Sequence, residues 1–178
     1  RALGKIKTEK EIINKIVDIM PYNLTDNQKR EILNRRQERM KRALLNVDNE
    51  ILNTIKQLHY KDIKLGLISN SDIIDSKHWK ESSLSEFFDV AVFSCDAGIM
   101  KPDTKIYETA MHMLSVSPKE SIFVGDGGSD ELYGAKIAGM RTVFTEYLER
   151  KPSDKIEKIK LYADFHIDKF YELLRCLE

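Results

Sequence analysis

The first 60 residues place apolar side chains at helical spacing and contain no strand pattern. Thr8 and Thr25 are each followed three residues later by Glu or Gln, which predicts a capping box at the start of two helices. Asp48 predicts the start of a third helix, and Pro21 predicts the break between the first two. We therefore expect a helical unit over residues 1–60.

Short apolar runs alternate with helical segments after residue 60. Runs this short, bounded by turn formers, predict buried strands at residues 63–68, 90–93, 122–124, 142–144 and 165–167. Helical spacing and capping residues predict helices around 73–80, near 84–88, from 103 to 114, from 132 to 140 and after 168. Alternating strands and helices predict an α/β fold with a parallel sheet and right-handed crossovers.

The composition is that of a packed globular chain, because 42% of the 178 residues are hydrophobic and 33% are charged. The formal net charge is zero, which favours neither a nucleic acid nor an anionic membrane as a partner. No segment of the sequence approaches the roughly 18 apolar residues of a membrane span. Cys95 and Cys176 form no disulfide framework or metal motif, so a reducing cytoplasm is the expected location.

Three acids stand in or just after the loop that follows the predicted strand 122–124, namely Asp126, Asp130 and Glu131. In open α/β sheets, ligands bind at the carboxyl ends of the strands. Carboxylates crowded at such an edge repel one another unless they share a cation, and hard oxygen ligands suit Mg²⁺. The alternative is an ordinary helix start, where acids suit the positive end of the helix.

Polar residues also end the two preceding strands. Ser69 and Asn70 follow the first strand, and Lys101 lies in the loop after the second. A hydroxyl, an ammonium and a group of carboxylates at one sheet edge fit a phosphate together with Mg²⁺. Each piece alone has another interpretation, since Ser-Asn is a common turn and Lys101 could be a solvated loop residue.

Three segments in this order carry a resemblance to a known family: LGLISNSD at 65–72, SCDAGIMKPDTKIYETA at 94–110 and SIFVGDGGSDELYGAKIAGM at 121–140. They resemble the second, third and fourth motifs of the haloacid-dehalogenase (HAD) superfamily of phosphatases and related hydrolases. The resemblance implies an α/β, Rossmann-like three-layer core over residues 61–178. Residues 1–60 resemble the helical cap of that family.

The resemblance also implies roles for the polar residues. Ser69 and Asn70 would hold the phosphoryl group of the substrate, and Lys101 would neutralise the nucleophile and the phosphoryl oxygens. Asp126 would ligate Mg²⁺. The second acid is either Asp130 or Glu131, and spacing measured back from the glycines at 134 and 139 favours Glu131.

One motif of the family is not found ahead of Ser69. The family carries an Asp-x-Asp nucleophile motif on a strand before the cap, between the strands that here end at Ser69 and Asp126, whereas this sequence begins at Arg1 in cap-like sequence. We therefore expect the nucleophile N-terminal to this chain, and the 178 residues alone to be inactive. The sequence leaves the oligomeric state open.

The implied function is a Mg²⁺-dependent phosphatase of a small phosphorylated metabolite that acts through an aspartyl-phosphate. A dehalogenase or a phosphomutase of the same superfamily is one alternative. A non-catalytic HAD-like binding module is another.

Residues 27–42 contain seven basic and two acidic residues, a net charge of +5. This charge could attract an anionic substrate or a nucleic acid. It could also be a solvated helix face with pairs such as Glu31–Arg35. The zero net charge of the chain favours the second interpretation, with no nucleic acid or membrane as partner.

Overall fold

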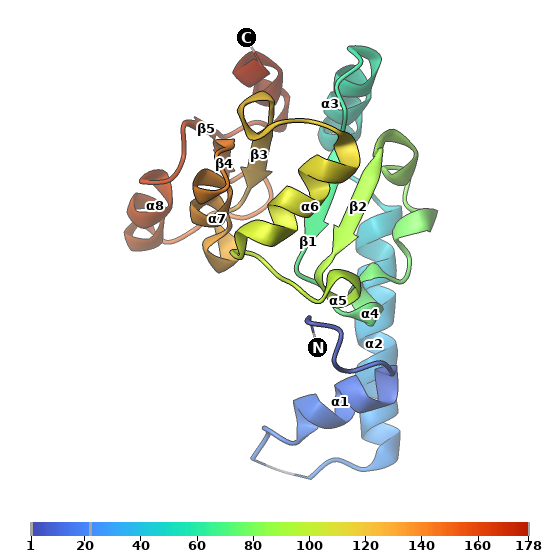
Figure 1. Ribbon diagram of the computed structural model, residues 1–178. Helices are drawn as coiled ribbons and strands as arrows, with labels where there is room; N and C mark the ends of the chain where they lie inside the picture. Colours follow the sequence, from blue (N-terminus) through green and yellow to red (C-terminus); the bar gives the residue numbers. More distant parts are fainter. Residues whose placement is uncertain (1, 22, 178) are drawn as a thin grey trace.

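The computed structural model describes residues 2–21 and 23–177, in which a helical arm extends from an α/β body (Figure 1). The arm consists of α1 (Glu9–Val17) and α2 (Asp26–Leu45), and α3 (Asn49–Tyr60) leads into the body. Both predicted capping boxes are present, because the hydroxyls of Thr8 and Thr25 accept backbone N–H bonds from the third residue of their helices. None of the 20 residues of α2, all of them described, is buried.

Helix α3 packs on the body. Its buried Ile55 and Leu58 join a cluster with Val143, Ile167 and Leu173 from the last strands and the C-terminal helix. The prediction that residues 1–60 are helical and contain no strand is therefore confirmed for the residues described. A division of the chain into a cap over 1–60 and a core over 61–178 stays a prediction, and α3 lies against the second of these parts.

Five strands form two parallel sheets across residues 2–21 and 23–177. In the first, β1 (Gly66–Ser69) pairs with β2 (Val90–Phe93). In the second, β4 (Arg141–Thr145) lies between β3 (Ile122–Gly125) and β5 (Phe165–Ile167). Among the described residues no hydrogen-bonded ladder joins β1 to β3, so each of these strands has one unpaired edge.

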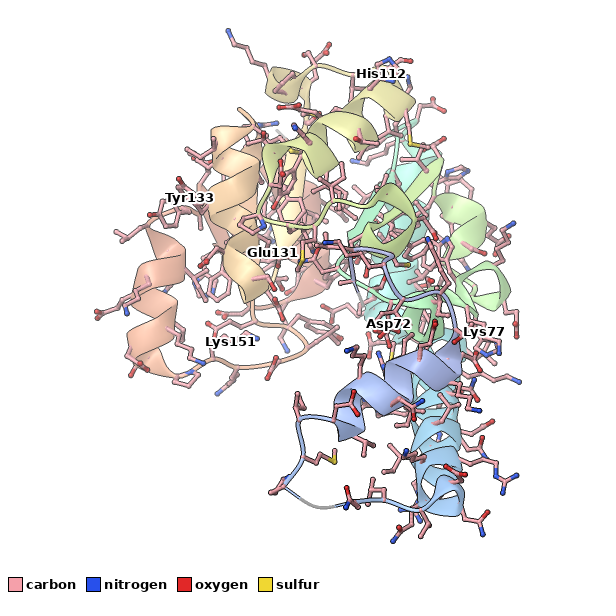
Figure 2. The ribbon with its side chains drawn as sticks, turned by 60° about the horizontal axis from the view of Figure 1, so that its bottom comes forward. Asp72, Lys77, His112, Glu131, Tyr133 and Lys151 are labelled. Carbon is pink, nitrogen blue, oxygen red and sulfur yellow. The ribbon has the colours of Figure 1, made fainter. Side chains whose placement is uncertain are left out.

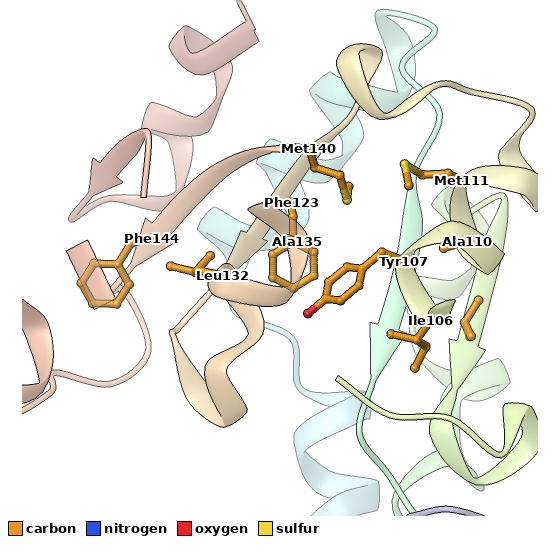
Figure 3. Close-up of a cluster of buried hydrophobic side chains, with 10 residues drawn as sticks. Ile106, Tyr107, Ala110, Met111, Phe123, Leu132, Ala135, Met140 and Phe144 are labelled. Carbon is orange, nitrogen blue, oxygen red and sulfur yellow. The ribbon is translucent and has the colours of Figure 1, made fainter. Parts of the chain in front are cut away.

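Helices cover both faces of the sheets, which gives the three-layer α/β architecture that the sequence predicts. On one face lie α6 (Thr104–Leu114) and α7 (Glu131–Ile137), and on the other lie α3 and the C-terminal helix. A buried cluster under α6 includes Val92 of β2, Phe123 of β3 and Phe144 of β4, so one core spans both sheets (Figure 3). Tyr107 is fully buried there, and its hydroxyl donates a hydrogen bond of 2.7 Å to the carbonyl oxygen of Glu131.

The segments between these elements differ from the prediction in several details. The helix expected at 73–80 is a single turn, α4 (Ile73–Ser76), because the chain then turns Trp79 inward against Phe88 and Phe93. A short helix, α5 (Ser94–Ala97), follows β2. The C-terminal helix has 3₁₀ geometry over Phe170–Leu177.

The remaining short turns of 3₁₀ helix are Trp79–Glu81, Ser85–Phe87, Pro118–Glu120 and Gly128–Asp130. Helix α8 (Ser153–Lys160) was not expected, since its sequence offers only two apolar residues. Within the part of the chain that the structure describes, no helix has both the length and the apolar character needed to span a bilayer.

Candidate functional site

Two hydrogen bonds made by the side-chain amide of Asn70 connect the loops after β1 and β2. The side chain of Asn70 donates a hydrogen bond of 2.9 Å to the carbonyl oxygen of Lys101, and the backbone N–H of Lys101 donates one of 2.8 Å to Oδ1 of Asn70. The backbone N–H of Ser71 donates to the hydroxyl of Ser94 at 3.0 Å, which joins the same two strand ends a second time. These bonds hold Lys101 beside the end of β1.

A buried ion pair connects the loop after β2 with the start of α7. Nζ of Lys101 lies 2.6 Å from Oε2 of Glu131, and the two side chains are only 11% and 8% exposed. The other carboxylate oxygen of Glu131 accepts a bond of 3.2 Å from the backbone N–H of Gly127. Burial raises the pKa of Glu131 above its ordinary value, and the nearby charge of Asp126 raises it further, whereas Lys101 acts to lower it. The lysine therefore stabilises a carboxylate that burial disfavours.

Asp126 lies on the same loop in a more open position. Its Oδ1 accepts a bond of 2.8 Å from the backbone N–H of Gly128, and its Oδ2 lies 3.2 Å from Nζ of Lys151. Partial burial acts to raise the pKa of Asp126, but the Gly128 bond and the Lys151 ammonium outweigh it and hold the pKa below its ordinary value. Asp126 is therefore an ionised carboxylate near neutral pH.

The structure separates the two adjacent acids of this loop. Glu131 is buried in the first turn of α7 and faces Lys101, whereas Asp130 is exposed in a left-handed conformation with φ of 51°. Ser129 is also left-handed, with φ of 54°. Non-glycine residues in this region are uncommon, and two in succession turn the chain sharply so that adjacent side chains face different ways. The interpretation that either acid binds a metal stays a prediction.

Two glycines allow this close arrangement. A Cβ atom on Gly125 would lie 2.2 Å from Oε1 of Glu131, so only glycine lets that carboxylate fold back over the strand end. A Cβ atom on Gly134 would lie 2.4 Å from the carbonyl oxygen of Pro102. Gly134 therefore lets α7 approach the Lys101–Pro102 loop closely enough for the ion pair to form.

Ser69 ends β1 at the same edge and is half-buried. Its hydroxyl makes no hydrogen bond to any other residue in the described ranges, so it is available to a ligand. Ser69, Asn70, Lys101, Asp126 and Glu131 thus all lie at the carboxyl ends of parallel strands, where the sequence places them.

Sequence reasoning missed Lys151, which lies in the loop between β4 and α8 (Figure 2). Nζ of Lys151 contacts Asp126, 25 residues earlier in the chain, and also lies 2.7 Å from an oxygen of Glu149. No local spacing signals a contact over such a separation, and the surrounding sequence is polar and carries no motif.

Comparison with known proteins agrees with this fold. The sequence model of a family described as haloacid dehalogenase-like hydrolase matches residues 7–145. The glyceraldehyde 3-phosphate phosphatase of Pyrococcus furiosus is 34% identical over 128 residues, which are 70% of this chain and 52% of that protein. The pyrophosphatase PpaX of Halalkalibacterium halodurans is 36% identical over 101 residues, which are 56% of this chain and 46% of that protein.

Solved structures show the same architecture. The HAD phosphatase from Thermococcus onnurineus superposes with a TM-score of 0.68 at 27% identity, over 92% of this chain and 69% of that one. The L-2-haloacid dehalogenase RSc1362 superposes with a TM-score of 0.72 at 16% identity, over 98% and 74%, which shows a shared fold alone. The chain spans about half the length of the curated relatives it matches. The family match covers most of the sequence, and the chain belongs to the haloacid dehalogenase-like hydrolases.

Proposed function

We propose that this chain is part of a Mg²⁺-dependent phosphatase that hydrolyses a small phosphorylated metabolite. The observation that carries the proposal is the buried Lys101–Glu131 pair close to Asp126, together with the unbonded hydroxyl of Ser69 at the carboxyl end of β1. A cation and an anionic phosphoryl group are the two ligands that such a set of groups serves together. One relative is named as a glyceraldehyde 3-phosphate phosphatase and another as a pyrophosphatase, and the first of these names supports this class of substrate.

The carboxylates fit a divalent cation. Asp126 and Glu131 are close enough for the charge of one to raise the pKa of the other. In each, one oxygen is fixed by a backbone N–H and the other faces a lysine, Lys151 for Asp126 and Lys101 for Glu131. Hard oxygen donors of this kind suit Mg²⁺, which usually takes one or two carboxylates and keeps several waters. When bound, Mg²⁺ would supply positive charge to the phosphoryl oxygens. Asp130 is exposed and left-handed, so we assign the second metal position to Glu131.

The remaining groups would bind the phosphoryl group. The Ser69 hydroxyl is available to donate a hydrogen bond, and Asn70 keeps one amide N–H beyond the bond it makes to Lys101. Lys101 would stabilise negative charge on the phosphoryl oxygens, in addition to its pairing with Glu131. These roles follow the family resemblance, and the contacts of Lys101 with Asn70 and Glu131 support them.

We assign the nucleophile to an aspartate outside this chain, which would form the aspartyl-phosphate. The support is that β1 and β3 each have one edge without a hydrogen-bonded neighbour among the described residues. Ser69 ends β1, and Asp126 directly follows β3. A strand paired in parallel to both edges would bring its own carboxyl end to the same site. On this proposal the 178 residues alone are inactive.

We further propose that neither a nucleic acid nor a membrane is a partner, since the charges of the chain cancel and α2 carries the expected exposed Glu31–Arg35 pair at 2.7 Å. A cytoplasmic location is proposed on the two free, buried cysteines, which suit a reducing compartment.

The test compares the full-length gene product with the 178-residue chain. Hydrolysis of glyceraldehyde 3-phosphate and of an aryl phosphate is measured with Mg²⁺ and with a chelator, and halide release from 2-chloropropionate is measured in parallel. We expect Mg²⁺-dependent ester hydrolysis by the full-length protein alone, reduced about 10²-fold or more by Asp126→Asn. Lys105→Met is the control variant, because it changes an exposed lysine of α6 outside the site and should leave the rate of hydrolysis unchanged. Halide release without ester hydrolysis, or equal ester hydrolysis by the short chain, would contradict the proposal.

A further inference from the structure

Lys151 is shared between two carboxylates. One is Asp126, inside the proposed metal site, at 3.2 Å. The other is Glu149, two residues earlier in the same loop, at 2.7 Å. The Lys151 side chain is 17% exposed, whereas the side chains of Asp126 and Glu149 are 48% and 67% exposed. The ammonium therefore sits in a sheltered position between an inner and an outer anion.

The main chain at this lysine is fixed independently of its side chain. The backbone N–H of Lys151 donates a hydrogen bond of 3.1 Å to Oε1 of Glu146, whose other carboxylate oxygen lies 3.1 Å from Nε2 of His166. The loop is thus anchored to β5 through the Glu146 side chain. Because the backbone is held, the ammonium can leave one of its two carboxylates through rotation of its flexible four-carbon side chain, without movement of the main chain.

We propose that Lys151 is a resident counter-cation of the metal site, which neutralises Asp126 before a divalent cation binds and stays paired with Glu149 alone when one does. The inference rests on the proposed function, because it takes Asp126 as a metal ligand. One oxygen of Asp126 is already committed to the Gly128 N–H, so the oxygen that faces Lys151 is the one left for a cation. A divalent ion and an ammonium repel each other at that oxygen, so both cannot hold it closely.

Glu149 gives Lys151 a second partner outside the metal site. A lysine expelled into solvent would lose its ion pair, whereas this lysine already has a second partner, Glu149, at 2.7 Å. Glu149 therefore lowers the cost of releasing Asp126, and Lys151 competes with Mg²⁺ only weakly. Removing the lysine and removing its outer partner must then change metal affinity in opposite directions.

The test is calorimetric titration of the full-length gene product with Mg²⁺, with Asp126→Asn defining the binding that belongs to this site. We expect Lys151→Met to tighten Mg²⁺ binding about fivefold, in line with the upper end of what a partly exposed charge pair contributes. Glu149→Gln should weaken binding about twofold, because Lys151 then rests on Asp126 alone. Lys155→Met is the matched control, since it removes an exposed lysine four residues further on, and it should change the affinity less than Lys151→Met does.

A second measurement follows the lysine itself. Mg²⁺ should increase the labelling of Lys151 by an amine-reactive reagent, read by mass spectrometry, without changing that of Lys155. If Mg²⁺ binds in an Asp126-dependent way but Lys151→Met matches Lys155→Met, Lys151 is no competitor and only this inference is overturned. If no Asp126-dependent binding occurs in the wild type or in Lys151→Met, the metal site of the proposed function is overturned with it.

Discussion

Replacing Lys101 by Met is expected to destabilise the fold by about 3 kcal/mol at neutral pH. The change removes one partner of an ion pair whose side chains are 11% and 8% exposed, and breaking a buried pair costs about 3–5 kcal/mol. The lower end applies because Glu131 keeps its bond from the Gly127 N–H. Methionine preserves most of the volume of the stem near Phe123, so little of the loss should come from packing.

The loss should depend on pH in a defined direction. The pKa of Glu131 in the folded protein is raised above its ordinary value of 4.5, chiefly by burial, so its contribution to stability is fully present below that value and is lost as pH rises through the folded pKa. Lys101 acts to lower this pKa, so its removal raises the pKa further. The variant should therefore be close to the wild type near pH 4.5 and fall behind it as the pH rises toward 8.

Thermal and denaturant unfolding of the wild type, Lys101→Met, Glu131→Gln and the double variant measure this effect. For a chain of this length, about 3 kcal/mol corresponds to a fall in Tm of roughly 6–12 °C. The double variant should recover most of the loss, because a neutral pair leaves no buried charge. Lys105→Met, an exposed lysine in α6, should change stability by less than about 0.5 kcal/mol. A Lys101→Met protein as stable as this control at pH 8 would refute the reasoning.

Three further predictions concern packing, the arm and its charge. Gly134→Ala should lower the free energy of unfolding in urea by about 1–3 kcal/mol, since its Cβ would lie 2.4 Å from the Pro102 carbonyl oxygen. An unchanged unfolding midpoint would mean that α7 can move away from this loop at no cost. Arg36→Met should cost about 2–3 kcal/mol by the same measurement, because Arg36 joins α2 to the buried carboxylate of Asp72 at 2.9 Å and the partly buried one of Asp75 at 2.7 Å. Stability equal to the wild type would show that these ion pairs add nothing. The 178-residue chain should not bind a short DNA duplex at about 150 mM salt, and micromolar binding by fluorescence anisotropy would assign a nucleic-acid role to α2.

Local sequence signals predicted most of the elements because their causes are local. The capping boxes at Thr8 and Thr25 lie within three residues of the groups that they bond, and the sequence shows both partners. The strands around Val92 and Phe123 were predicted because continuous apolar runs suit a sheet covered on both faces. Helix α8 was missed because few of its residues face the body; one that does is Ile159, which packs where a side chain on Gly127 would lie.

The positions of the candidate residues at strand ends were predictable, and their contacts were not. The strand pattern placed Asn70, Lys101 and Asp126 in the segments that follow β1, β2 and β3. The sequence could not show that Lys101 pairs with Glu131, or that Gly134 makes this possible, because both depend on how closely α7 approaches the loop after β2. Lys151 gave no signal at all, since its contact with Asp126 depends on the path of an irregular loop.

The exposure of α2 also affects where proteases are expected to cut the chain. A helix of 20 residues with no buried side chain loses little apolar burial when it opens, so it should open locally far more often than α6 or α7, which line the core. Trypsin cuts after Lys and Arg, and α2 contains many of these residues. Arg36 should be cut less readily than the others, because it is paired with Asp72 and Asp75. In cell extracts the arm should therefore be nicked first, while the α/β body persists as a resistant fragment.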